Sequence, residues 1–389
     1  MRFLDYVSIN PKISLEKERI YPFVEMGDVS TSFRNPDKVE YKSFDSGVKF
    51  ADGDTVIARI TPCLQNGKRF YCKNIGKGFG STEYLVFRPK DSSVDNLYLY
   101  YFMNTDFIKE SMVRSMVGAT GRQRVNNDVF SRLDVTFPNI EIQRRIAEIL
   151  STYDDLIENN RKQIKLLEEA AQRLYKEWFV DLRFPGHENT KITDGIPERW
   201  RKYKFSDITS IMSGGTPKTD VKEFYNGNIP FYTPKDSGDS FFAFDTITHI
   251  SQSGLDNCNS QLYPVNTIII TARGTVGKTT ILAVPMAMNQ SCYALKCDEL
   301  NSPYYLFFSL KNEVAALKTM SNGGVFNTII VKTFDSICLI APTQDVLNMF
   351  EASVSPIMEQ IKTKARQNII LTEARDRLLP KLMSGEIEV

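Results

Sequence analysis

An internal repeat constrains this chain more than any other feature of its sequence. When the sequence is shifted by 204 residues, KQIKLLEEAAQRL (162–174) falls on RQNIILTEARDRL (366–378), with Gln, Leu, Glu, Ala, Arg and Leu coinciding. At the same shift Phe130 meets Phe334 and Pro138 meets Pro342. A long-period self-similarity indicates a repeated structural unit. The sequence therefore predicts two copies of a domain followed by a helix.

The domain copies are rich in short β-branched and aromatic runs that Gly, Asn, Asp and Pro interrupt. Such runs predict strands joined by turns. We expect an α+β fold in which two β-rich α/β domains are separated by a pair of long helices, with pseudo-twofold internal symmetry. The expected bounds are 1–138 and 198–342 for the domains, 139–183 and 343–389 for the helices, and 184–197 for a linker.

The helical segments carry apolar residues at heptad spacing. Residues 141–179 contain no Pro or Gly, and a helix of that length is about 58 Å long. Because it would outrun one domain, we expect the two helices to pair antiparallel as a coiled-coil spacer. The alternative is that each helix packs only on its own domain. Pro356 should kink or break the second helix near its start.

Two apolar stripes run along the first helix, a pairing seam and a second stripe beside it. The second stripe, which widens the apolar face of the helix, consists of Leu150, Ile157, Ile164, Ala171 and Trp178. The predicted pairing seam consists of Ile146, Ile149, Tyr153, Leu167 and Leu174 on the first helix and Phe350, Ile361, Leu371 and Leu378 on the second.

Composition excludes several classes of protein. The 389 residues carry 48 Lys and Arg against 47 Asp and Glu, so a DNA site requires segregated charge rather than an overall excess. Two histidines and six cysteines without a C-x-x-C pair disfavour structural zinc, and we expect no cofactor. Without a signal-like N-terminus or a run of 18 apolar residues, we expect a cytoplasmic protein with reduced thiols and no membrane partner.

One segment resembles a nucleotide-binding motif. ARGTVGKT (272–279) matches the P-loop pattern except for Ala272 at the first glycine. A P-loop is followed by a helix, whereas ILAVPMAMN (281–289) favours a strand. The chain also lacks the Asn/Asp-Pro-Pro-aromatic tetrad of adenine methyltransferases. We therefore expect no catalysis; the alternatives are an ATP-binding DNA-modifying enzyme that uses 272–279, and an interaction scaffold without a DNA role.

Both copies carry loops suited to DNA. Residues 117–127 (VGATGRQRVNN) form a Gly-rich basic loop that matches 321–328, and seven cations with one anion, Glu83, lie between Arg59 and Lys90. Arg can bind guanine and Asn or Gln adenine in the major groove, while Lys and Arg bind phosphates. The alternative is an ordinary charged surface. The candidate DNA-binding residues are Arg59, Lys68, Arg69, Arg122, Gln123 and Arg124 in the first copy and Lys235, Arg273, Lys278 and Asn327 in the second.

A series of motifs identifies a family. The second half carries W-x-x-Y-x-F-x-D-I (200–208), IMSGGTP (211–217), IPFYTPKD (229–236), ARGTVGK (272–278) and NQSCYAL (289–295). Together with residues 140–188, this order resembles the specificity subunit of type I restriction–modification enzymes over essentially the whole chain. The first copy departs from the pattern, because it lacks the Trp and the SGGTP signature. Its DNA contacts therefore cannot be transferred from the second copy.

The resemblance implies a division of labour. The two domains would be target recognition domains, each of which reads one half of a split, asymmetric sequence in double-stranded DNA. The helices would be the central and distal conserved regions, which set the gap between the half-sites and dock two methyltransferase subunits. Motor–nuclease subunits would join that complex, and the chain itself would catalyse neither methylation nor cleavage.

Overall fold

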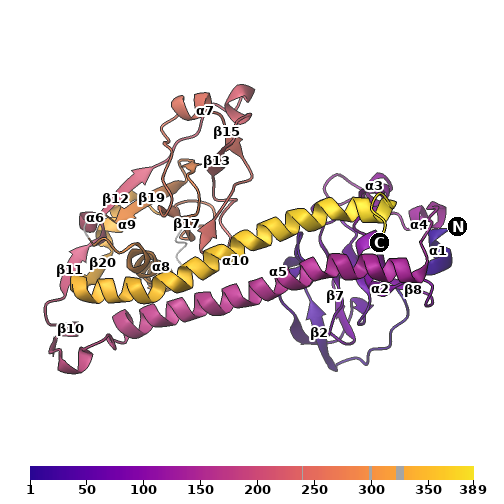
Figure 1. The fold of residues 1–389 in the computed structure, drawn as a ribbon, viewed down its shortest axis with the longest axis horizontal. Helices are drawn as coiled ribbons and strands as arrows, with labels where there is room; N and C mark the ends of the chain where they lie inside the picture. The colour runs from indigo at the N-terminus through magenta and orange to yellow at the C-terminus, as the bar shows by residue number, and fades with distance from the viewer. Residues whose placement is uncertain (239, 298–299, 321–327) are drawn as a thin grey trace. The chain divides into compact units, whose positions relative to one another are not determined.

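The computed structural model describes residues 1–389 except 239, 298–299 and 321–327. The chain divides into two compact units. Unit 1 is Met1–Asn160 with Gln367–Val389, and unit 2 is Arg161–Arg366. Each unit combines one β-rich domain with parts of the two long helices, α5 (Ile140–Tyr175) and α10 (Gln344–Ser384) (Figure 1). The α+β class predicted from the sequence is confirmed.

The domain in unit 1 contains two four-stranded sheets. One has the order β1-β8-β5-β6 and is antiparallel throughout, and the other has the order β3-β2-β7-β4. The strands are β1 Val7–Ile9, β2 Ile20–Val24, β3 Glu40–Ser43, β4 Val48–Phe50, β5 Thr55–Ala58, β6 Arg69–Tyr71, β7 Gly78–Gly80 and β8 Tyr84–Pro89. The short helices are α1 Phe3–Tyr6, α2 Asn96–Phe102, α3 Asp106–Arg114 and α4 Asp128–Arg132, with a 3-10 turn at Met26–Asp28.

The domain in unit 2 contains a five-stranded sheet, β12-β19-β16-β17-β14, a three-stranded sheet, β15-β13-β18, and the pairs β11-β20 and β10-β9. The strands are β9 Ile192–Thr193, β10 Ile196–Pro197, β11 Arg201–Lys204, β12 Thr209–Ser213, β13 Ile229–Tyr232, β14 Phe242–Ala243, β15 His249–Ile250, β16 Ile268–Thr271, β17 Thr279–Leu282, β18 Ala287–Met288, β19 Cys292–Cys297 and β20 Cys338–Ala341. The helices are α6 Phe205–Ile208, α7 Gln252–Asp256, α8 Pro303–Met320 and α9 Val331–Ser336, with 3-10 turns at His187–Asn189 and Lys222–Tyr225.

The two domains share one strand order, which confirms the repeat. The order β1-β8-β5-β6 matches β12-β19-β16-β17, and β14 is an addition in unit 2. Likewise β2 is antiparallel to β3 and parallel to β7, as β13 is to β15 and β18. The central strands β5 and β16 are buried at every position, because sheet neighbours flank them on both sides. Phe130 and Phe334, which coincide in the repeat, are both fully buried.

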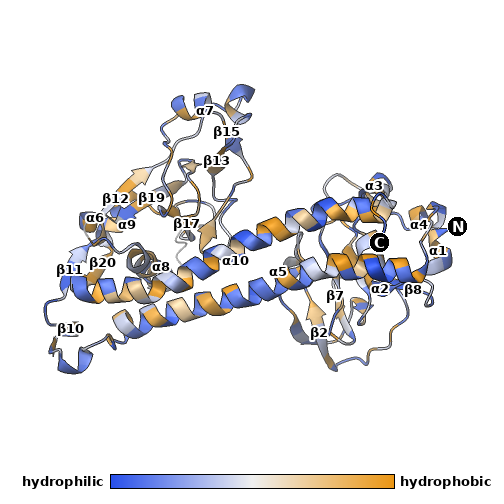
Figure 2. Cartoon of the chain, viewed as in Figure 1, coloured by the Kyte–Doolittle hydropathy of each residue, from blue (hydrophilic) through white to orange (hydrophobic). Residues whose placement is uncertain are grey.

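The two long helices pair antiparallel in each unit. In unit 1, Ile146 of α5 shares a core with Leu382 of α10, and further along α5 Asp154 binds Arg375. Residue numbers on α10 thus fall as those on α5 rise. In unit 2 the Tyr175 ring lies 6.4 Å from that of Phe350. Figure 2 shows the apolar residues recurring along both helices between hydrophilic ones, so the predicted pairing is confirmed.

The most buried face of α5 differs from the predicted seam. Leu150, Ile157 and Ala171, which belong to the second stripe, are at most 1% exposed. On the predicted seam, Ile146, Phe350 and Ile361 are buried, whereas the rest are only half-buried: Ile149, Tyr153, Leu167, Leu174, Leu371 and Leu378. In unit 1, α5 packs on aromatic residues of α2 as well as on α10. Its buried face is therefore wider than a two-helix seam and has a different centre.

Of the kink or break predicted at Pro356, the break does not occur, because α10 continues through this residue from Gln344 to Ser384. Proline removes one backbone donor from a helix. Val354 and Met358 on either side are fully buried in the core of unit 2. Their packing holds the helix together across the missing hydrogen bond.

The segment expected as a linker is partly ordered. Strands β9 and β10 form a hairpin whose two turn residues, Asp194 and Gly195, have φ of 51° and 75°, as a tight hairpin turn requires. The rings of Phe184 and Trp200 lie 4.8 Å apart within the core of unit 2. Within the described residues, no helix is long and apolar enough to cross a bilayer.

Candidate nucleic-acid interface

In unit 1 the loop after β5 runs beside the basic segment 123–125. The Thr61 amide donates to the Gln123 carbonyl at 3.0 Å, and the Val125 amide donates to the Arg59 carbonyl at 2.9 Å. This pairing brings two predicted DNA-binding segments, separated by some sixty residues in sequence, onto one surface. Arg59, Gln123 and Arg124 therefore lie together.

The Gly-rich loop is a narrow hairpin. Val117 and Arg124 exchange backbone hydrogen bonds of 3.0 and 2.9 Å. Gly118 and Gly121 have φ of 123° and 80°, a region that residues with a Cβ rarely adopt. The chain therefore reverses within a few residues and presents Arg122, which is exposed, near its tip.

A third loop joins this surface through Lys68, whose ammonium donates to the Met26 carbonyl at 2.6 Å. Two other candidate cations also fasten loops. The Arg59 guanidinium donates to the Val125 carbonyl at 3.2 Å, and that of Arg69 to the Gly67 carbonyl at 2.9 Å. These three side chains hold the loops in place, in addition to contributing positive charge.

Arg124 has a carboxylate partner. Its Nε lies 2.9 Å from Glu83 Oε2 and its Nη2 2.6 Å from Glu83 Oε1, a two-pronged ion pair. The hydrogen bonds from Arg124 lower the pKa of the Glu83 carboxyl despite its partial burial. Arg124 is thus neutralised in the DNA-free chain, whereas Arg122 is presented at the hairpin tip. The sequence did not distinguish these two arginines.

The basic run from Arg59 to Lys90 does not form a single face. Arg88 makes a two-pronged ion pair with the fully buried Asp54, at 2.6 and 2.8 Å. Lys73 donates to Asp155 of α5 at 3.2 Å. At least these two cations serve the fold of unit 1 rather than an open surface.

In unit 2 the segment 272–279 joins two antiparallel strands. Ile270 of β16 pairs with Thr279 of β17, and the Thr271 amide donates to the Lys278 carbonyl at 3.0 Å. A P-loop instead leads from a strand into a helix whose N-terminus faces the phosphates. The segment is therefore a β-hairpin turn, and it gives no support to the nucleotide-binding alternative.

A second loop packs against this hairpin turn. The hydroxyls of Ser237 and Thr275 lie 2.6 Å apart, and the Thr275 hydroxyl donates to the Pro234 carbonyl at 3.2 Å. Lys235, Arg273 and Lys278 on these two loops are all exposed. Partial burial, followed by the nearby Lys278 charge, lowers the pKa of Lys318 on α8, so positive charge is concentrated here. Asn327 lies outside the described residues.

The two domains thus present one arrangement. In each, the hairpin after the central strand contacts a preceding loop, through Lys68 in unit 1 and Thr275 in unit 2. In each, the segment after the Gly-rich loop pairs back onto that hairpin. Val125 donates to Arg59 and Ile329 to Ala272, both at 2.9 Å, and Val125 and Ile329 coincide at the 204-residue shift. The repeat therefore duplicates a candidate recognition surface, not only a fold.

Sequence reasoning missed one group of functional candidates, a buried ionic cluster in unit 1. Asp154 and Arg375 are 2% and 6% exposed and bind each other. The signal was present in the helical pattern. Asp154 lies between Leu150 and Ile157 on the buried stripe of α5, and charged residues on such a stripe require a partner.

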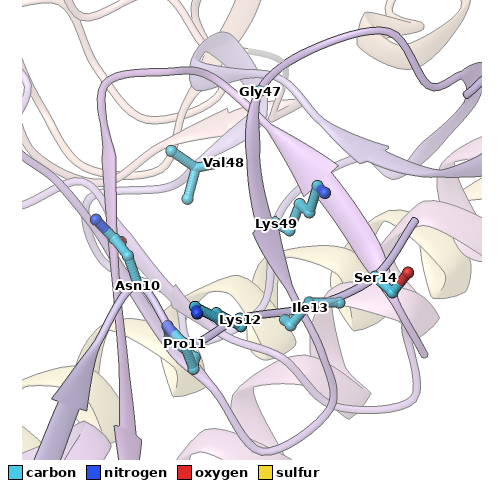
Figure 3. A pocket seen from close by; sticks show the side chains of 8 residues that line it. All are labelled: Asn10, Pro11, Lys12, Ile13, Ser14, Gly47, Val48 and Lys49. Carbon is cyan, nitrogen blue, oxygen red and sulfur yellow. The ribbon is translucent and has the colours of Figure 1, made fainter. Parts of the chain in front are cut away.

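The structure contains a surface hollow in unit 1, lined by residues 10–14 and 47–49 (Figure 3). Its lining includes Lys12 and Lys49 but, among the residues that form it, no carboxylate, imidazole or thiol. It therefore offers no acid–base pair. Across the part of the chain that the structure describes, no three His, Cys, Asp or Glu residues form a group suited to a metal ion.

Comparison with known proteins places these features in a family. A family profile described as the type I restriction modification DNA specificity domain matches residues 8–169 and 197–346. The HindI specificity subunit of Haemophilus influenzae is 26% identical, over 94% of this chain and 94% of its own length. The MjaIX specificity subunit of Methanocaldococcus jannaschii is 29% identical, over 77% of this chain and 71% of its own.

A solved structure shares the fold. The S subunit of a type I restriction–modification system from M. genitalium has a TM-score of 0.59, with 18% sequence identity. The alignment covers 98% of this chain and 95% of that protein.

Proposed function

The chain belongs to the type I restriction modification DNA specificity family and is a specificity subunit, the non-catalytic part that recognises DNA; from that premise we propose that each of its two domains reads one half of a split DNA target. The observation that carries this proposal is the duplicated loop arrangement. Both domains present exposed cations on loops of this arrangement, Arg122 on the Gly-rich loop of unit 1 and Arg273 on the hairpin after the central strand of unit 2. Two similar but non-identical surfaces suit two different half-sites.

The candidate residues divide by role. Arg122 and Arg273 are exposed on tight loops, and an arginine so presented can bind guanine through two hydrogen bonds. Lys235 and Lys278 would bind phosphates, which fix register without reading sequence. Arg59, Lys68 and Arg69 would act mainly by holding their loops, since each donates to a backbone carbonyl. Arg124 would contact DNA only after leaving Glu83.

The helices complete the proposal. The paired α5 and α10 would set the gap between the half-sites, and two methyltransferase subunits would dock on them. Motor–nuclease subunits would then join that complex to cleave DNA. The recognition domains would comprise residues 1–138 and 198–342. Since its target is DNA, the complex would work in the cytoplasm.

A salt-dependent titration tests whether the chain binds DNA at all. A protein that neutralises phosphates releases counterions, so log K falls with log[salt] by about 0.9 per phosphate. We expect a steep slope with the full chain and duplex DNA, and a smaller slope for Lys278→Ala. Arg114→Ala on α3 is the matched control, because it removes one exposed cation outside these loops. A chain without measurable affinity for duplex DNA would be an interaction scaffold instead.

A further inference from the structure

The two long helices and the first domain meet at one carboxylate. Asp154 of α5 accepts the Arg375 guanidinium of α10 on Oδ1 and the Tyr101 hydroxyl of α2 on Oδ2, each at 2.5 Å. Asp154 and Tyr101 are 2% exposed and Arg375 is 6% exposed. Each carboxylate oxygen therefore has its own donor, one from the second helix and one from the recognition domain.

A loop of the same domain enters this cluster. The Arg34 side chain, 1% exposed, forms an ion pair with Asp155 of α5. The Ser32 carbonyl accepts a hydrogen bond from the Arg375 guanidinium at 3.1 Å. Residues 32–34 thus contact both helices, through side chain and backbone.

This loop continues into the candidate DNA surface. Met26, a few residues before Ser32, accepts the Lys68 ammonium, and the loop that contains Lys68 also pairs with the segment that follows Arg122. An unbroken series of contacts therefore runs from the ionic cluster to the hairpin that presents Arg122. A change in the cluster can alter the position of that hairpin relative to the helices.

The second half has apolar residues at the equivalent positions. At the 204-residue shift Asp154 corresponds to Met358 and Arg375 to Ala171, and both are fully buried in unit 2. A buried ion pair adds little net stability compared with well-packed apolar residues. The helix pair therefore does not require charge to hold together, and the cluster in unit 1 calls for another explanation.

We propose that Arg34, Asp154 and Arg375 are positioning residues that fix the orientation of the first recognition domain on the helix pair, and thereby the number of base pairs accepted between the two half-sites. The proposal rests on the function proposed above. Its physical basis is directionality, because hydrogen-bonded ion pairs hold one geometry, whereas apolar contacts are non-directional. With the charges removed, the domain can tilt or shift on the helices while remaining docked.

The test replaces the Asp154–Arg375 ion pair with the residues of the other half and also removes the Tyr101 hydroxyl. The variant Tyr101→Phe/Asp154→Met/Arg375→Ala removes both donors together with their acceptor, so that neither member of the pair is left buried alone. Arg34→Met is a second, milder variant, because its partner Asp155 is half-exposed and keeps Lys73. The matched control is Asp54→Asn/Arg88→Met, which disrupts an ion pair of the same domain in which Asp54 is fully buried and both partners lie outside the long helices.

The full chain is first used to select its target from randomised duplexes. Binding is then measured on that target with one base pair inserted into or deleted from the gap, and each variant's unfolding is followed in denaturant. We expect the wild type and the control to bind the altered gaps about tenfold or more weakly than the selected gap. For both cluster variants we expect a penalty of about threefold or less, with unchanged half-site sequences.

Each outcome decides between positioning and a purely structural role. Cluster variants that unfold more easily but keep the wild-type gap penalty would overturn the proposal, while leaving the two-domain reading intact. A control that relaxes the gap as much as the cluster variants do would also overturn it, because general loosening would then suffice. A wild-type chain that selects no split sequence would overturn both this proposal and the function on which it rests.

Discussion

Individual arginines in the candidate interface differ in whether they are available to contact DNA. Arg122 and Arg124 are two positions apart in sequence, yet Arg124 is held by Glu83 and Arg122 is presented at a hairpin tip. The partners Glu83 and Arg124 are 41 residues apart in sequence. No local pattern reports such a pairing, so the sequence could nominate both arginines but could not rank them.

Removing the carboxylate should strengthen DNA binding. Glu83→Gln deletes one negative charge from the candidate surface and releases Arg124 toward phosphates. We expect higher affinity for duplex DNA and a salt slope steeper by up to about one unit. The measurement is the same salt titration, and Glu110→Gln on α3, which breaks an exposed ion pair, controls for net charge. Equal effects from both substitutions would show that Glu83 acts only through net charge and not through its ion pair with Arg124.

Among the elements, the two long helices were the most predictable. Their heptad spacing and length indicated an antiparallel pair, because an apolar stripe on a long helix must be covered. The exact buried face was less predictable. Pattern reading considers one partner for each helix, whereas α5 contacts both α10 and α2 in unit 1. For the same reason the pattern did not single out Asp154, whose partners come from α10 and α2.

A pair of identical substitutions tests the buried face of α5. Leu150 is fully buried and Leu156 is 48% exposed on the same helix. Leu150→Asp should lower the free energy of unfolding by about 3 kcal/mol or more, because it buries an unpaired charge. Leu156→Asp should change it by about 0.5 kcal/mol or less. Denaturant titration of both variants measures the difference; similar losses would show that the face is wrongly assigned.

The N-terminus of helix α8 is hydrogen-bonded to a carboxylate of α10. Glu351 Oε1 accepts the Ser302 hydroxyl at 2.5 Å and the amides of Tyr304 and Tyr305 at 3.0 and 3.2 Å. These bonds satisfy donors that a helix N-terminus leaves free. Burial nevertheless raises the pKa of the Glu351 carboxyl above its ordinary value, against the opposing effect of these bonds.

The raised pKa of Glu351 determines how its contribution to stability changes with pH. The folded chain retains this proton at a pH where the unfolded chain has released it. The contribution of Glu351 to the free energy of unfolding therefore falls as pH rises from the ordinary glutamate pKa through the raised one. Glu351→Gln keeps an acceptor but cannot titrate, so its stability should lack this component. Parallel pH profiles of stability for wild type and variant would contradict the assignment.

At the scale of the whole molecule, duplication was the most informative feature of the sequence. The 204-residue shift predicted two β-rich domains and two helices, and the shared strand order confirms them. The order β1-β8-β5-β6 itself was beyond the sequence, because strands far apart along the chain become neighbours. The P-loop likeness of 272–279 was resolved by its context, since β17 follows it rather than a helix.

We propose that one chain reads a split DNA target with two separate domains. The most direct measurement is a binding selection on randomised duplex DNA with the full chain and its Arg122→Ala and Arg273→Ala variants, with Arg114→Ala as control. Loss of a two-pronged base contact should cost about 1–3 kcal/mol and relax one position of the site. We expect Arg122→Ala to relax the sequence preference in one half-site only, and Arg273→Ala in the other only. Equal relaxation of both half-sites by either substitution, or selection of a single continuous sequence by the wild type, would rule out two separate readers.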